Sequence, residues 1–382
     1  MSRTLVVTND FPPRIGGIQS FVHALAVRQP PGSLVVYAST YQGAARFDAE
    51  QPFPVVRHPT GLLVPTPEAL RRISAVARAE GCDTVWYGAA APLGLLSSGL
   101  RRAGVERFVA TTHGHEAGWA ALPVARQLLR RVGRQVDVVT YLGEYTRRRI
   151  AGAFGPHPEL VRLPPGVDTR AFHPGVDGAG IRAELGLSDR PTVVCVSRLV
   201  PRKGQDVLIR ALPAIQRRVP GAALLIVGGG PDFPRLHRLA ASLGVADDVV
   251  FTGKVPGPEL PGYFAAGDVF AMPARTRHLG LDVEGLGIVY LEASAVGRPV
   301  VAGDSGGAPD AVLPGETGHV VDGRDVDQVA GRVADLLADP AEAAAMGRRG
   351  RAWVEREWRW DLLANRLHTL LTPSASDAAA TG

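Results

Sequence analysis

Residues 191–206 have the sequence PTVVCVSRLVPRKGQD, and this stretch decides the fold. Its first part, Thr192–Ser197, is apolar almost without interruption, as expected of a strand covered on both faces in a parallel sheet. A basic turn follows, and Val207–Arg217 then has the spacing of a helix with one apolar face. A buried strand that leads through a short turn into a helix is the repeating unit of an open α/β sheet.

The same unit recurs on both sides of this stretch. Apolar runs of strand length alternate with helical patterns, among them Glu68–Glu80, Pro234–Leu243 and Gln328–Ala338. The further expected strands are Thr4–Thr8, Leu34–Ala38, Val55–Arg57, Thr84–Tyr87, Phe108–Thr111, Val138–Tyr141, Ala223–Val227, Val249–Thr252, Val269–Ala271, Pro299–Ala302 and His319–Val321. Two such series predict two doubly wound, Rossmann-like α/β domains.

A segment rich in proline and glycine, Leu163–Gly175, lies between the two series. It predicts a linker, because the alternation of strands and helices restarts directly after it; a surface loop within one domain is the alternative. The length of 382 residues agrees with two domains of ~100–200 residues each. Residues 372–382 are small and polar, and we expect a disordered tail there.

The composition narrows the classes of function. Cys82 and Cys195 are the only cysteines, which excludes a disulfide framework and favours a reducing compartment. No apolar run reaches the ~18 residues of a membrane-spanning helix. Residues 1–175 carry a net charge of +8, and residues 176–382 carry a net charge of −3. The basic first half therefore indicates an anionic partner: a membrane surface, a phosphorylated acceptor or nucleic acid.

The basic turn after the strand Thr192–Ser197 is a candidate ligand site. It carries Arg198 and Lys203 at the carboxyl end of a strand, where open α/β sheets bind their ligands. A guanidinium fork and an ammonium group together suit a diphosphate and need no metal ion. A solvated basic loop is the alternative. Because Lys203 is one of only two lysines in the chain, the other being Lys254, the functional interpretation is favoured.

Two carboxylates, Glu284 and Glu292, stand eight residues apart around a turn that contains glycine. We expect Glu284 in a loop and Glu292 about one turn into a helix that begins near Ile288. The backbone amides of residues 285–287 would lie between them at the helix N-terminus. This arrangement suits a nucleotide sugar, with one carboxylate on sugar hydroxyls and the other on the ribose diol. A general acid–base pair and a solvated face are the alternatives.

Two turns in the first half of the chain could face a ligand. The turn Thr8–Gln19 contains Gly16 and Gly17, which allow a phosphate or a sugar to approach the backbone, although an ordinary tight turn explains it equally well. His113 follows the strand Phe108–Thr111 and could contact a sugar hydroxyl.

Two cofactor interpretations find little support. A zinc site at His113, His115 and Glu116 lacks further ligands at a suitable spacing. Leu224–Pro231 contains three successive glycines, but the last glycine of a dinucleotide fingerprint is replaced by Phe233 and no acid ends the next strand.

A stripe of arginines marks one predicted helix, Leu122–Gln135. Arg126, Arg130 and Arg134 follow one another at intervals of four residues, and Arg131 stands beside them. Such a stripe could dock the headgroups of anionic lipids, or it could be an ordinary solvated face.

Together, these segments resemble the retaining GT-B glycosyltransferases of family four. The Arg-x4-Lys and Glu-x7-Glu pairs described above are that family's most specific motifs, and the resemblance covers residues 1–371. Within the family, the similarity extends to the actinobacterial mannosyltransferases that use GDP-mannose and act on phosphatidylinositol mannosides. This closer similarity is carried by Thr8–Pro13, Thr112–Glu116, Ser197–Asp206, Phe270–Arg277 and Gly280–Ala293.

The resemblance implies an α/β GT-B architecture, in which two Rossmann-like doubly wound domains face each other across a cleft. Residues 1–168, with residues 357–371 crossing back to them, would form an acceptor-binding domain. Residues 169–356 would form the domain that binds the donor, GDP-mannose.

The resemblance also implies roles for individual residues. The catalytic residues would be His113, Arg198, Lys203 and Glu284. The donor would be bound by Gly16, Gly17, Arg198, Lys203, Val255, Glu284, Gly285, Leu286, Gly287 and Glu292. Arg198 and Lys203 would hold the diphosphate, and Val255 would lie near the guanine through its backbone. Glu284 would bind mannose hydroxyls and Glu292 the ribose.

The activity implied is retaining transfer of mannose from GDP-mannose to a phosphatidylinositol (mono)mannoside in an α-1,6 linkage, without a cofactor or metal. No carboxylate is placed as a nucleophile, which favours attack on the same face, with the departing phosphate taking the acceptor proton. His113 would face the transferred mannose. The expected partners are GDP-mannose, an anionic inositol phospholipid and the inner leaflet, with no nucleic acid. The expected location is cytoplasmic and peripheral, on the inner face of the plasma membrane.

The sequence departs from the family pattern at two places. His278 and Leu279 occupy a stretch where the resemblance leads us to expect glycines, and Asp310 replaces the usual glutamate after a Gly-Gly-x-Pro turn. Three alternative functions stay open: a related GT-B enzyme that uses a UDP- or ADP-sugar and a soluble acceptor, a non-catalytic protein that binds nucleotide sugars, and an NAD-linked oxidoreductase.

Overall fold

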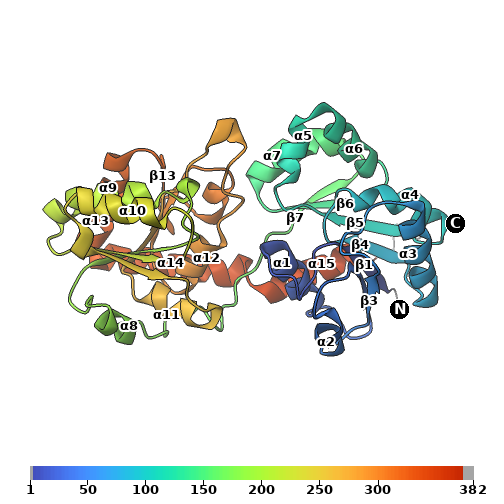
Figure 1. Cartoon of the computed structure of the whole chain (residues 1–382), viewed down its shortest axis with the longest axis horizontal. Helices are drawn as coiled ribbons and strands as arrows, with labels where there is room; N and C mark the ends of the chain where they lie inside the picture. The colour runs from blue at the N-terminus through green and yellow to red at the C-terminus, as the bar shows by residue number, and fades with distance from the viewer. Residues whose placement is uncertain (1–2, 373–382) are drawn as a thin grey trace. The chain divides into compact units, whose positions relative to one another are not determined.

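Two parallel sheets, each flanked by helices on both faces, organise the chain (Figure 1). The computed structural model describes residues 3–372. These divide into unit 1, which extends to Pro165 and resumes at Trp360, and unit 2, Gly166–Arg359. The disordered tail expected for residues 372–382 lies outside the described residues, apart from Thr372.

Unit 1 contains a sheet of seven strands in the order β3-β2-β1-β4-β5-β6-β7, all parallel. The strands are β1 (Thr4–Thr8), β2 (Leu34–Ser39), β3 (Val55–His58), β4 (Thr84–Tyr87), β5 (Arg107–Thr111), β6 (Val138–Tyr141) and β7 (Glu159–Arg162). The central strands β1, β2 and β4 are buried along their whole length, which explains their continuous apolar sequence.

In the described part of unit 1, eight α-helices accompany the sheet. They are α1 (Gly17–Ala26), α2 (Ala44–Ala49), α3 (Pro67–Ala79), α4 (Ser97–Arg102), α5 (Glu116–Ala121), α6 (Pro123–Gly133), α7 (Glu144–Phe154) and α15 (Trp360–Leu371). Helix α15 comes from the far end of the sequence and packs beside α1, where Leu363 and Leu367 join Phe21 and Leu25 in one apolar core (Figure 1).

Unit 2 contains a sheet of six parallel strands in the order β10-β9-β8-β11-β12-β13. The strands are β8 (Thr192–Val196), β9 (Ala223–Val227), β10 (Val249–Gly253), β11 (Val269–Met272), β12 (Val300–Gly303) and β13 (Gly318–Val321). The order repeats that of the first six strands of unit 1, so both units have Rossmann topology.

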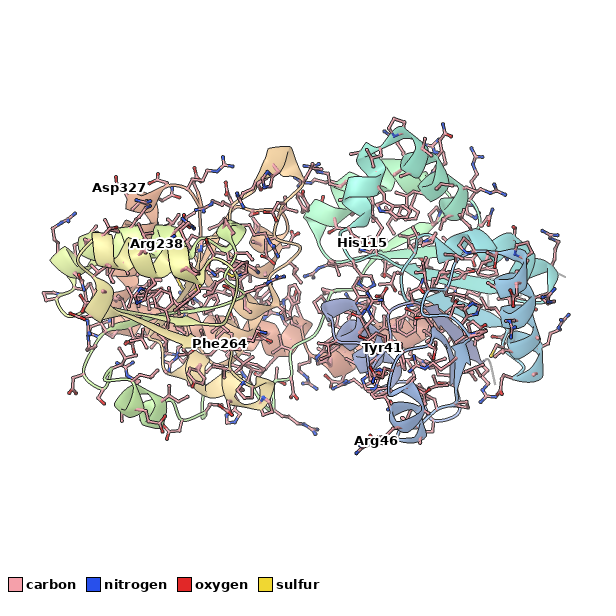
Figure 2. The ribbon with its side chains drawn as sticks, in the orientation of Figure 1. Tyr41, Arg46, His115, Arg238, Phe264 and Asp327 are labelled. Carbon is pink, nitrogen blue, oxygen red and sulfur yellow. The ribbon has the colours of Figure 1, made fainter. Side chains whose placement is uncertain are left out.

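Seven helices belong to unit 2, and they form two layers. They are α8 (Ala179–Glu184), α9 (Gln205–Arg218), α10 (Phe233–Ser242), α11 (Leu260–Ala265), α12 (Ile288–Ala295), α13 (Val326–Ala338) and α14 (Pro340–Glu357). Helices α9, α10 and α13 cover one face of the sheet, and α11 lies on the other (Figure 1). Phe264 of α11, labelled in Figure 2, is fully buried between Phe172 and Phe270.

The predicted strands are all confirmed, with ends within about a residue of those expected. Strand β7 was not predicted, because Glu159–Arg162 is only partly buried and lacks a continuous apolar run. The division into units also differs from the predicted domain boundaries, by three residues at each crossing. Residues 166–168 and 357–359 belong to unit 2, because the Val167 amide donates to the Trp358 carbonyl and both side chains join the core of unit 2.

Candidate active site

The topology of unit 2 singles out one edge of its sheet for ligand binding. Strand order reverses at β8, since β9 and β10 lie on one side of it and β11 to β13 on the other. Ligands of open α/β sheets bind outside the carboxyl ends of the strands at such a switch point. The two loops that leave this point are residues 197–204, after β8, and residues 273–287, after β11. They carry Arg198, Lys203 and Glu284.

Lys203 and Glu284 form an ion pair across the switch point. The Lys203 Nζ lies 2.5 Å from Glu284 Oε2, and both residues are buried, with exposed fractions of 9% and 7%. The Arg202 guanidinium lies 3.9 Å from the same carboxylate oxygen. The pair joins the Arg-x4-Lys motif to the Glu-x7-Glu motif, and the attraction between the two buried charges offsets part of the cost of removing them from water.

The backbone at Gly204 allows the two loops to meet. Its φ of +78° lies in the left-handed region, and a Cβ there would collide with the Pro273 carbonyl. The amide of Arg275 donates to the Arg202 carbonyl at 2.8 Å, and the Arg275 guanidinium lies 2.9 Å from a carboxylate oxygen of Asp206. A backbone hydrogen bond and an ion pair therefore both hold the two loops together.

Arg198 differs from Lys203 in having a free side chain. It is exposed, and its guanidinium has no hydrogen bond or ion pair with any residue of the described part of the chain. Its backbone is fixed, because Gln205 Nε2 donates to the Ser197 hydroxyl at 2.8 Å and to the Arg198 carbonyl at 3.1 Å. A fixed loop that presents an unpaired guanidinium is suited to bind an anion.

A cavity of about 560 Å³ adjoins Arg198. Its lining includes Val255, Lys254 and the glycines at positions 228–230. These glycines are required by packing, since a Cβ at Gly228 or Gly230 would collide with the backbone after β8. The glycine-rich turn that fails as a dinucleotide fingerprint thus forms a wall of the predicted donor pocket. Our sequence analysis assigned no role to Lys254, although lysine is rare in this chain.

Glu292 lies in the second turn of α12, and its carboxylate has no hydrogen bond or ion pair with any described residue. It is half-buried, and burial raises the pKa of its carboxyl from 4.5 to about 7. Burial of this kind argues against the solvated face that was an alternative for Glu292. A ligand with two hydroxyl donors would supply the hydrogen bonds that the ionised carboxylate lacks.

The raised pKa of Glu292 predicts a pH dependence of nucleotide binding. If only the ionised carboxylate accepts both hydrogen bonds from a ribose, the Kd for GDP falls by about tenfold between about pH 6 and pH 8. In the ligand-free protein the same shift lowers the free energy of unfolding as pH rises from the carboxyl's ordinary 4.5 through about 7, because the folded state favours the protonated form.

Calorimetric titrations across this pH range check the prediction. Dideoxy-GDP, which has the same titrating phosphate but no diol, is the matched ligand, and Glu292→Gln is the matched variant. Both should lose the tenfold dependence. An unchanged pH profile in Glu292→Gln would show that this carboxylate does not meet the ribose.

The turn at residues 285–287 is held by a second loop that the sequence analysis did not assign. The Ser305 hydroxyl, fully buried, accepts from the Glu284 amide at 3.2 Å, and the Gly307 amide donates to the Glu284 carbonyl at 2.8 Å. Gly287, at φ +80°, caps α12, which begins at Ile288. Gly285, Leu286 and Gly287 thus lead directly into the helix N-terminus, where they were predicted to lie. Asp310 belongs to the short 3₁₀ helix Ala308–Ala311 that follows this second loop.

His278 shows why glycine is expected in its stretch. Its φ is +49°, which is uncommon for any residue other than glycine. It begins the short helix His278–Gly280.

In unit 1, Gly16 and Gly17 form the start of α1 after the loop that leaves β1. Gln19 Nε2 donates to Asp10 Oδ1 at 2.7 Å beneath this turn. A Cβ at Gly16 would collide with the Gln19 side chain, whereas a Cβ at Gly17 would meet nothing within 4 Å. Open space at Gly17 agrees with a helix N-terminus that a ligand could approach.

His113 has a defined tautomer. Its Nε2 lies 2.6 Å from the Gly88 carbonyl oxygen, so this nitrogen carries the proton and donates. Burial lowers the pKa of His113, which therefore is neutral and keeps Nδ1 as an acceptor. The fully buried Glu116 holds the turn by accepting from the amides of His113 and Gly114. Within residues 3–372, no three metal-ligating side chains form a group.

Three arginines of the stripe, Arg126, Arg130 and Arg131, lie on α6, and Arg134 directly follows its last residue. Arg126, Arg130, Arg131 and Arg134 are all exposed, and Arg130 donates to the Gly152 carbonyl at 3.3 Å. The helix buries Leu129 and Val132 against unit 1. Three apolar side chains near the arginines are also exposed: Leu122, Val124 and Leu128.

Comparison with known proteins identifies the family. The model described as "Glycosyltransferase Family 4" matches residues 15–171, and the model described as "Glycosyl transferases group 1" matches residues 179–353. A Mycolicibacterium smegmatis protein named GDP-mannose-dependent alpha-(1-6)-phosphatidylinositol monomannoside mannosyltransferase is 58% identical over 96% of this chain and 98% of its own. The chain belongs to this mannosyltransferase family.

Other similar proteins agree with membership of the mannosyltransferase family. The Corynebacterium glutamicum relative, named for a monoacylated form of the same acceptor, is 49% identical over 97% of both chains. In fold, the mannosyltransferase resembles Anabaena HepE in complex with UDP (TM-score 0.79, 19% identity, 97% of this chain and 99% of the other). It also resembles sucrose-phosphate synthase from Thermosynechococcus elongatus (TM-score 0.75, 22% identity, all of both chains). The predicted GT-B fold is confirmed.

Proposed function

We propose that this protein transfers mannose from GDP-mannose to a phosphatidylinositol monomannoside, in an α-1,6 linkage and with retention of configuration. One observation carries the proposal: a free guanidinium, a buried Lys–Glu pair and an unpartnered carboxylate lie on the loops and helix around a single switch point. The 58% identity with a relative named for this reaction supports the choice of donor and acceptor.

The donor is assigned to unit 2. Arg198 binds the diphosphate as a fork, and Lys203 adds a point charge beside it. Glu284, held by Lys203, accepts hydrogen bonds from mannose hydroxyls. Glu292 binds the ribose diol, and the guanine enters the cavity lined by Val255 and Lys254.

The reaction breaks the bond between mannose C1 and the β-phosphate oxygen, and the acceptor hydroxyl forms the new bond to C1 on the same face. The proton of that hydroxyl passes to the departing phosphate oxygen. Arg198 and Lys203 stabilise the negative charge that develops on the diphosphate, and this charge stabilisation is the main contribution of the chain. Glu284 is engaged with Lys203, which suits it to positioning the sugar rather than to nucleophilic attack.

Unit 1 is assigned to the acceptor, and three of its residues are assigned to the donor. The neutral Nδ1 of His113 accepts a hydrogen bond from a hydroxyl of the transferred mannose, and Gly16 and Gly17 offer their backbone to the donor phosphate at the start of α1. We assign no cofactor, because the guanidinium and ammonium groups supply the positive charge that a metal ion would otherwise bring to a diphosphate.

Calorimetric titration with GDP, UDP and ADP, each with and without EDTA, tests the donor assignment. GDP should bind at least tenfold more tightly than the others, and EDTA should leave its Kd unchanged. A preference for UDP or ADP would favour the related transferase for other nucleotide sugars, and loss of GDP binding in EDTA would overturn the metal-independent assignment.

The membrane surface is assigned to α6, on the inner face of the plasma membrane. No helix within residues 3–372 is long and apolar enough to cross a membrane. Exposed Leu122 and Val124 could enter the lipid interface beside Arg126 and Arg134, and each arginine near an anionic surface contributes about 1 kcal/mol.

Charge reversal on α6 should therefore weaken membrane binding. Arg126→Glu with Arg134→Glu is expected to lower the partition onto vesicles rich in phosphatidylinositol by more than about tenfold. Arg210→Glu with Arg217→Glu, two exposed arginines of α9 in unit 2, changes the net charge equally and should have little effect. Co-sedimentation with vesicles measures the partition. If both double variants lose membrane binding equally, the net charge of the protein, and not the position of the arginines on α6, determines the binding.

A further inference from the structure

A second cavity lies at the opposite edge of the unit 2 sheet from the donor loops. Its volume is about 770 Å³. Pro191, Asp268 and Pro299 line it, and each directly precedes a strand, namely β8, β11 and β12. The donor loops leave the carboxyl ends of β8 and β11, so this cavity is distinct from the predicted donor pocket.

One part of the lining is apolar. Leu336 and Leu337 from the end of α13, Ala343 from α14 and Val296 after α12 contribute to it. These side chains are themselves buried, with at most 7% exposed, and so they belong to rigid packing rather than to a mobile surface. A wall of this kind binds the hydrocarbon part of a ligand.

The other part of the lining is basic. Five arginines contribute, and three have carboxylate partners: Arg182 with Asp268 at 3.1 Å, Arg190 with Asp248 at 2.5 Å, and Arg351 with Glu355 at 2.7 Å.

Arg298 and Arg348 have no carboxylate within 4.0 Å in the part of the chain that the structure describes. Arg298 donates from Nη2 to the Ala265 carbonyl at 2.7 Å, while its Nε is buried without a partner. Arg348 is exposed, and its guanidinium makes no hydrogen bond with a described residue. An exposed acid, Asp189, also lines the cavity. The unpaired groups therefore have an excess of positive charge.

We propose that this cavity is a binding site for a small amphipathic anion, with a carboxylate or phosphate on Arg298 and Arg348 and a hydrocarbon body against the Leu336–Leu337 wall. A half-buried guanidinium with an orphaned Nε gains most from an anionic partner, because its desolvation is not offset within the chain. The volume falls within the ~300–1,000 Å³ of small-molecule sites.

Calorimetric titration of the full chain with octanoate, octyl phosphate, octanol and inorganic phosphate tests the proposal. Octanoate or octyl phosphate should bind at least about tenfold more tightly than octanol and inorganic phosphate, since both the charge and the chain contribute. The tighter of the two anions distinguishes a fatty-acid headgroup from a lipid phosphate. Equal binding of octanol and octanoate would overturn the proposal, as would the absence of saturable binding by both anions.

Matched variants locate the site. Ala344 is exposed on α14 and lines the cavity, whereas Ala341 is exposed on the same helix outside the lining. Ala344→Phe fills the cavity and should weaken binding of the better anion by at least about tenfold, while Ala341→Phe should not. Arg348→Glu should weaken it similarly. Binding that is equal in both phenylalanine variants would place the anion elsewhere. Unchanged thermal unfolding confirms that each variant folds.

Discussion

Lys203→Ala is expected to lower kcat/KM for mannose transfer by about 10³, because it removes one of the two positive charges assigned to the departing diphosphate. The same substitution should lower the free energy of unfolding by about 3 kcal/mol, since Glu284 is then left as a buried carboxylate without its partner at 2.5 Å. Arg202, at 3.9 Å from the same oxygen, compensates only in part. Steady-state kinetics and urea unfolding measure the two effects.

A double variant separates the two effects. Lys203→Met with Glu284→Gln removes both charges, so most of the lost stability should return while activity should not. Recovery of activity together with stability would mean that Lys203 acts through folding alone. Near-normal turnover in Lys203→Ala would contradict the assignment of Lys203 to the charge on the departing diphosphate.

Arg198→Ala should also lower kcat/KM, by about 10²–10³, but without a change in stability. The structural reason is that the Arg198 guanidinium makes no hydrogen bond or ion pair with a described residue, whereas its backbone is held by Gln205 through the Arg198 carbonyl. The loop therefore keeps its shape when the side chain is removed. Kinetics with GDP-mannose as the varied substrate, beside a thermal unfolding curve, test both halves of this expectation.

Arg217→Ala is the matched control, because Arg217 is exposed on α9 and its guanidinium also makes no hydrogen bond or ion pair with a described residue. It should leave both activity and stability unchanged. Arg198→Lys should recover only part of the activity, since an ammonium group cannot form the two parallel hydrogen bonds of a guanidinium. Full activity in Arg198→Ala would contradict the diphosphate assignment.

The sheets could be predicted because their strands are short, apolar and buried on both faces. Strands β1 and β9 illustrate this: each is fully buried and was predicted with its observed ends. Strand β7 has no such signal, since Glu159 is exposed and its neighbours are only partly buried. The predicted domain boundaries differ from the observed ones by three residues, because the hydrogen bond of Val167 with Trp358 joins residues far apart in the sequence.

The residues of the candidate site could be predicted where their spacing in the sequence forms a motif. Arg198, Lys203, Glu284 and Glu292 stand in motifs that a sequence displays directly. The ion pair of Lys203 with Glu284 is a tertiary contact between loops that follow different strands, and no spacing indicates it. Ser305 could not be predicted for the same reason, because its buried hydroxyl lies on a third loop and accepts a hydrogen bond from the Glu284 amide.

The charge state of individual groups likewise comes from the structure. The spacing of Glu292 from Glu284 can be read from the sequence, but the rise of the Glu292 pKa to about 7 follows from burial of its carboxyl in three dimensions. The tautomer of His113 depends on the Gly88 carbonyl, 25 residues away in the sequence, and its neutral state follows from burial of the ring.

The central claim is the transfer reaction itself. The most direct measurement incubates the protein with GDP-mannose and phosphatidylinositol monomannoside in vesicles, in the presence of EDTA, and analyses the lipid product by mass spectrometry and NMR. The account predicts a product one hexose heavier, with an α-1,6 linkage, and its loss in Lys203→Ala. A β-linked product would contradict retention, and the absence of any mannosylated lipid, with GDP-mannose intact, would contradict the proposed function.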